Sequence, residues 1–199
     1  MASFACRAHK VFDGVHSGAK RPGAIRGLLR QCNTRKDVEV VCGVLIHKAA
    51  KNDCLHIVEA ILQDLPDEQT PTRPSRASIA NIPRGSKDYT PLCQALYRGN
   101  IKMAKALIAA GADIFFVNAD GERLDDVIAQ GEVDFTTEHT SDQVFIKEKY
   151  RQCRLFIDRR ERWIEETANR DMTVHTYWPR AAQAAATKIQ RCYRKNNRR

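Results

Sequence analysis

Residues 88–113 carry start and stop signals for two short helices, and this pattern constrains the fold more than any other. Thr90 is a good helix N-cap, and Pro91 suits the first helical position, where its missing N–H costs nothing. Gly99 suits a tight turn, and Gly111 suits a left-handed C-terminal cap. The apolar residues form one face on each helix: Leu92, Ala95, Leu96 and Met103, Ala106, Leu107. We therefore expect a pair of antiparallel helices joined by a turn.

The same unit recurs along the chain. Gly121 follows Asp88 by 33 residues, a period typical of helical repeats. Residues 88–113 resemble an ankyrin repeat, with Thr-Pro-Leu opening the first helix and Gly-Ala-Asp closing the second. Residues 45–53 resemble the core of an earlier repeat. Cys93 stands where the family usually has histidine, so we expect the family's hydroxyl–imidazole hydrogen bond to be lost.

The resemblance implies an all-α fold: a short ankyrin-like solenoid followed by a long helix and a C-terminal helix. We assign residues 21–136 to the repeats. Residues 66–87 exceed the repeat period and are rich in proline, serine and threonine, so we expect an inserted loop there. Residues 1–20 are basic and lack the apolar region of a secretory signal, which favours a disordered leader, with an organelle transit peptide as the alternative.

Residues 140–170 are expected to form one long helix. Its apolar positions recur at nearly heptad spacing: Ile146, Tyr150, Cys153, Ile157, Ile164. Three interpretations remain open. The helix can cover the end of the solenoid, because solenoid ends need a polar outer face. It can instead pair in a coiled coil, or its flanking arginines can make it a second calmodulin-binding helix.

Residues 179–199 are expected to form a basic amphipathic helix with an apolar stripe that includes Ile189. The segment resembles an IQ motif, although Lys195 replaces the usual glycine and the sequence stops before the second apolar anchor. The resemblance implies binding to calmodulin or a related EF-hand protein, favouring its C-lobe. The implied contact residues are Ala185, Lys188, Ile189, Gln190, Cys192, Tyr193, Arg194 and Arg199.

A second candidate site is the expected hairpin tip at Phe115, Phe116, Val117 and Asn118, where the family favours small or polar residues. Exposed aromatic residues there would be costly unless something covers them. One interpretation is that the helix at 140–170 folds back over them. The other is that they form a hot spot for a protein partner.

Composition narrows the function. The net charge of +9 favours acidic partners, and no apolar stretch approaches the ~18 residues of a membrane span. The seven cysteines are scattered without a Cys-x-x-Cys pair, which favours a reducing, cytoplasmic location over disulfides or zinc. No catalytic, cofactor or metal motif was found, so we expect no enzyme and no small-molecule substrate.

The main hypothesis is a non-catalytic protein-interaction scaffold, with ankyrin-like repeats for one partner and a calmodulin-binding tail. The alternative is a basic protein that binds nucleic acid or an anionic surface. Salt dependence separates the two hypotheses, because phosphate contacts weaken steeply between low and moderate salt.

Overall fold

The computed structural model describes residues 3–21, 23–138 and 142–170. Within these residues the structure is helical, apart from an isolated antiparallel bridge between Arg84 and Tyr89. The all-α fold class is therefore confirmed. The helices are α1 (Phe4–His16), α2 (Gly23–Arg30), α3 (Arg35–Lys51), α4 (Leu55–Gln63), α5 (Arg76–Ala80), α6 (Pro91–Tyr97), α7 (Ile101–Ala109), α8 (Leu124–Glu138) and α9 (Gln143–Arg170).

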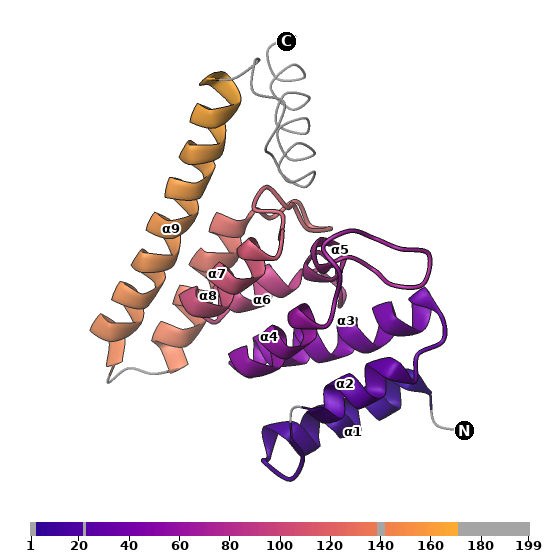
Figure 1. Cartoon of the computed structure of the whole chain (residues 1–199). Helices are drawn as coiled ribbons and strands as arrows, with labels where there is room; N and C mark the ends of the chain where they lie inside the picture. Colours follow the sequence, from indigo (N-terminus) through magenta and orange to yellow (C-terminus); the bar gives the residue numbers. More distant parts are fainter. Residues whose placement is uncertain (1–2, 22, 139–141, 171–199) are drawn as a thin grey trace.

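Eight of these helices form a stack of four pairs (Figure 1). The first helices of the pairs, α1, α3, α6 and α8, pack in one row, each against the next. The second helices, α2, α4, α7 and α9, pack in a parallel row. Each pair buries its apolar faces against its neighbours, which is how a helical solenoid builds a continuous core from units that cannot bury one alone.

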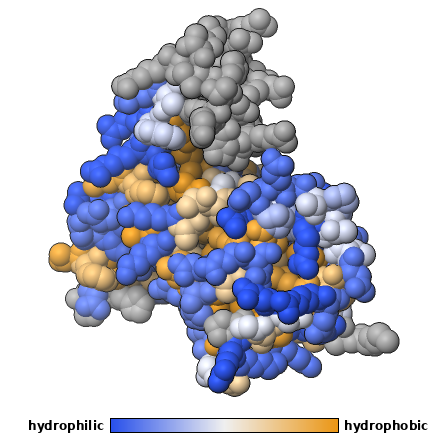
Figure 2. All heavy atoms as spheres, viewed as in Figure 1, coloured by the Kyte–Doolittle hydropathy of each residue, from blue (hydrophilic) through white to orange (hydrophobic). Residues whose placement is uncertain are grey.

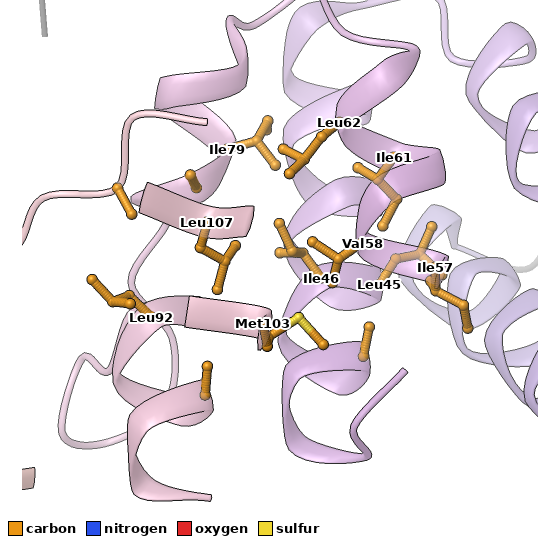
Figure 3. Packing of buried hydrophobic residues seen from close by; sticks show 14 of the residues in the cluster. Leu45, Ile46, Ile57, Val58, Ile61, Leu62, Ile79, Leu92, Met103 and Leu107 are labelled. Atoms are coloured by element: carbon orange, nitrogen blue, oxygen red, sulfur yellow. The ribbon is translucent and has the colours of Figure 1, made fainter. Parts of the chain in front are cut away.

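Buried apolar residues fill the space between the two central pairs (Figure 3). Leu45 and Ile46 of α3 lie beside Ile57, Val58 and Ile61 of α4, and all five are fully buried. Leu92, Met103 and Leu107 close the cluster from α6 and α7. Of the residues predicted on the facing sides of the 88–113 pair, Ala106 is only half-buried. The others, Leu92, Ala95, Leu96, Met103 and Leu107, are buried in this interior.

Residues 3–20 differ from the disordered leader expected from their charge. Ser3 caps α1 by accepting the backbone N–H of Cys6 at 3.3 Å. The helix buries one apolar stripe, Ala8, Phe12 and Val15, and it packs against α3. An ion pair between Asp13 and Lys48 also joins the two helices. The stripe has the i, i+4, i+7 spacing of a core-facing helix, a signal hidden among basic residues.

The expected loop at 66–87 also contains ordered structure. Ser75 caps the short helix α5, whose Ile79 and Ala80 are fully buried. Asn81 then links this segment to the end of the next pair, donating to the Gly111 carbonyl at 2.8 Å and accepting the Asp113 N–H at 2.7 Å. The extra residues are therefore tied to the stack at one end.

Helix α9 is the second helix of the last pair and is far longer than its counterparts (Figure 1). The expected stripe is buried at Ile146, Tyr150, Cys153 and Ile157, against α7 and α8. Phe145, which lies off the stripe, is 72% exposed. The stripe thus packs on α7 and α8, the arrangement expected of a helix that covers the end of the stack. Pairing in a coiled coil and binding of calmodulin by this helix stay predictions. No described helix is both long and apolar enough to cross a membrane.

Candidate protein-binding surface

Two neighbouring loops project from the first-helix row, and we call them finger 1 (residues 82–90) and finger 2 (residues 113–123). Finger 1 is a short hairpin in which the Arg84 N–H donates to the Tyr89 carbonyl at 3.0 Å. Its turn contains Gly85 and Asp88, both at positive φ. Finger 2 joins α7 to α8. Finger 1 leads into α6 and finger 2 into α8, the first helices of successive pairs, so the two fingers occupy equivalent positions.

Glu122 joins the two fingers. Its carboxylate accepts from Lys87 Nζ at 3.1 Å, from the Tyr89 hydroxyl at 3.0 Å and from Asn118 Nδ2 at 2.6 Å. The bond from Lys87 is the largest cause that lowers the pKa of Glu122. The same bond raises the pKa of Lys87, so both groups remain charged at neutral pH. The fingers are thus fixed side by side by one carboxylate.

Asn118 shapes finger 2 from within. Its Oδ1 accepts the backbone N–H groups of Asp120 at 3.0 Å and Glu122 at 2.8 Å. Only 6% of the residue is exposed. This is the local side-chain-to-backbone bonding for which asparagine is favoured in turns. Of the four predicted tip residues, Asn118 is therefore placed to hold the loop rather than to touch a partner.

The other three predicted tip residues differ in how far they are buried. Phe115 and Phe116 are half-buried and pack against the core, and the Phe115 N–H donates to Asp113 Oδ1 at 2.9 Å. Val117 is 52% exposed. The two aromatic rings are thus partly covered by the chain's own core, and Val117 is the apolar residue that finger 2 exposes to solvent.

Two polar contacts support the base of finger 1. His47 Nε2 donates to the Ile82 carbonyl at 2.7 Å, and burial is the main cause that lowers the pKa of this imidazole. The Thr90 hydroxyl accepts the Cys93 N–H and donates to Cys93 Sγ, both at 3.3 Å. With cysteine at this position there is no hydroxyl–imidazole bond, and the Cys93 thiol makes a contact with the Thr90 hydroxyl instead.

The fingers' polar contacts were missed by the sequence argument, although a signal was present. Tyr89 and Glu122 are 33 residues apart, and so are Lys87 and Asp120. Lys87 forms ion pairs with both Asp120, at 3.8 Å, and Glu122, at 3.1 Å. Aligning the chain with itself at the repeat period would have placed these residues in equivalent positions of adjacent loops. The predicted calmodulin-binding residues between Ala185 and Arg199 lie outside the described residues.

Comparison with known families identifies one segment. The ankyrin repeat family model matches residues 87–119, which span the end of finger 1, α6, α7 and part of finger 2. No curated protein and no solved structure matches the chain. The chain therefore contains an ankyrin repeat within an all-α helical stack, and this repeat indicates a role in protein–protein interaction.

Groups with catalytic potential are sparse in the described part of the chain. No cluster of three or more His, Cys, Asp or Glu side chains there could hold a metal ion. Burial raises the pKa of Cys93 and of Cys153, the latter to about 11, so these thiols stay protonated at neutral pH. They serve as small apolar core residues.

Proposed function

We propose that this protein is a non-catalytic scaffold whose ankyrin-like stack binds a protein partner through fingers 1 and 2. The observation that carries the proposal is the Glu122 link, which holds two successive fingers in one fixed arrangement. A surface fixed before binding loses little conformational entropy when a partner docks. The ankyrin repeat match, which covers part of each finger, supports the same role.

Val117 is the apolar anchor of this surface. We expect Val117→Asp to abolish capture of the partner while leaving the melting temperature within about 2 °C of the wild type, because exposed substitutions usually change stability by less than ~0.5 kcal/mol. The measurement is affinity capture with quantitative mass spectrometry, beside a thermal melt of each variant.

The matched control is Val133→Asp, on α8, where the valine is similarly exposed but outside the fingers. It should retain every protein that the wild type captures. If the two variants lose the same proteins, the fingers are not the binding surface.

We further propose that residues 185–199 bind calmodulin or a related EF-hand protein. The support is the sequence alone: Ile189 and Gln190 followed by Arg194, on a segment with a strong basic bias. The apolar stripe would fill the hydrophobic groove of an EF-hand lobe, and the basic residues would face its acidic rim. Cys192 and Tyr193 extend the stripe.

Replacing both Ile189 and Gln190 by alanine should weaken calmodulin binding at least about tenfold, since burying an isoleucine contributes roughly 1.5–3 kcal/mol. The measurement is calorimetric titration of the full chain with and without calcium, at two salt concentrations. The isolated C-lobe should bind more tightly than the isolated N-lobe. Equal affinity of the two lobes would contradict the C-lobe preference, and binding that disappears at moderate salt would indicate non-specific charge attraction.

A further inference from the structure

Three arginine side chains meet at one cleft on the second-helix row, away from the fingers. Arg26 and Arg30 lie one turn apart on α2, and Arg73 comes from the loop between α4 and α5. Together with Leu29 and Asp64 they line a cleft of about 270 Å³. On the face seen in Figure 2, hydrophilic residues predominate and apolar residues show through in patches.

The charges of the cleft do not balance. Asp64 is the one carboxylate among its lining residues, and Arg26 Nε donates to both of its oxygens, at 2.8 and 3.0 Å. Arg30 and Arg73 make no ion pair with any residue that the structure describes. Three guanidinium groups thus line the cleft with one carboxylate, which leaves an excess of two positive charges among its lining residues.

The loop that carries Arg73 is fixed in place. The Thr70 N–H donates to the Arg73 carbonyl, and the Arg73 N–H donates to Thr70 Oγ1, both at 2.9 Å. The next two residues, Pro74 and Ser75, are buried. The loop belongs to the segment that exceeds the repeat period, so the extra residues build the cleft wall opposite α2.

We propose that this cleft binds an acidic side chain of a protein partner, either a carboxylate or a phosphorylated residue. Guanidinium groups present planar sets of donors that match carboxylate and phosphate oxygens. The buried Leu29 gives the cleft an apolar floor beneath those donors. The proposal deepens the protein-binding role proposed above and rests on it, but it concerns a different surface.

The test uses the full chain and three fluorescein-labelled peptides of one sequence that differ at a single central residue: glutamate, phosphoserine or glutamine. Fluorescence anisotropy gives each Kd at low and moderate salt. The wild type should bind the glutamate or phosphoserine peptide and not the glutamine peptide. Arg30→Gln and Arg73→Gln should each weaken that binding about tenfold, the typical effect of losing a charge-assisted hydrogen bond.

The matched control is Arg159→Gln, an exposed position on α9 that removes the same charge elsewhere. It should leave the Kd unchanged. Arg73→Lys should fall between the wild type and Arg73→Gln, because it keeps the charge but loses the planar donors. Thermal melts establish that each variant is folded. A Kd more than tenfold lower for phosphoserine than for glutamate assigns a phosphorylated partner, and similar values assign a carboxylate.

Three results would overturn the proposal: no binding of either acidic peptide to the wild type, equal weakening by Arg159→Gln, or tighter binding of a single-stranded RNA with the same dependence on Arg30 and Arg73. The last result would assign the cleft to nucleic acid. Val117→Asp should not change peptide binding. Loss of the finger surface alone and loss of the cleft alone are therefore distinguishable outcomes.

Discussion

Tyr150→Ala is expected to destabilise the protein by about 3–5 kcal/mol, the range found when a large buried aromatic residue is removed. Tyr150, on α9, is 1% exposed, and its ring lies beside Phe135 of α8. For a domain of this size, such a loss lowers the melting temperature by roughly 10 °C. Differential scanning calorimetry of the full chain measures the change.

The hydroxyl of Tyr150 has its own role. It donates at 2.6 Å to the backbone carbonyl of Tyr97, the last residue of α6. Carbonyls in the last turn of a helix have no partner within the helix, so this bond satisfies a group that would otherwise be buried without one. Tyr150→Phe, which keeps the ring, should therefore cost about 1–2 kcal/mol. If the two variants melt at the same temperature, ring packing is not the main contribution.

Gly131→Ala is expected to destabilise the protein by about 2–3 kcal/mol, against the usual trend that alanine stabilises helices. A Cβ on Gly131 would lie 2.2 Å from the Tyr97 carbonyl oxygen, a backbone atom that cannot rotate away. Helix α8 would have to move off α6, and such overpacking costs about 1–3 kcal/mol or more. The melting temperature should fall by roughly 5–10 °C.

The control for this prediction is Gly27→Ala on α2, where a Cβ would meet nothing within 4 Å. There the helix propensity of alanine acts alone, and the variant should gain about 0.5–1 kcal/mol. Opposite signs for two glycine-to-alanine changes within helices isolate the close approach of α8 to α6. If Gly27→Ala is destabilised as well, the loss at Gly131 cannot be assigned to the contact with Tyr97 alone.

Local signals were enough to predict the pair formed by α6 and α7. Thr90, Pro91 and Gly111 mark helix ends through backbone chemistry that needs no tertiary context, and the structure places a helix start or end beside each. The buried face of α9 was also predictable, because the spacing of its apolar residues shows which side of the helix faces the core. Predictions from charge alone were weaker: the basic residues of α1 hid the apolar stripe that packs it on α3.

The candidate sites show where sequence reasoning stops. Val117 is exposed as a partner residue should be, but Asn118 is turned inward by hydrogen bonds within its own loop. Asparagine favours such bonds in turns, but the local sequence does not say whether a given asparagine makes them or faces solvent. Arg73 is separated from Arg26 by more than one repeat, and the cleft they share depends on how the extra loop folds onto α2. Tertiary placement decided both cases.

The stacked rows also bear on how the chain acquires its fold. Each pair packs against the pairs next to it along the sequence, so few contacts require distant parts of the chain to meet. Chains with mostly local contacts fold fast, because closing short loops costs little entropy. Folding of such a stack can begin at any pair and spread to its neighbours, and during synthesis the N-terminal pairs are available first. Helix α9 would join last, adding its tyrosine hydroxyl to a carbonyl already in place.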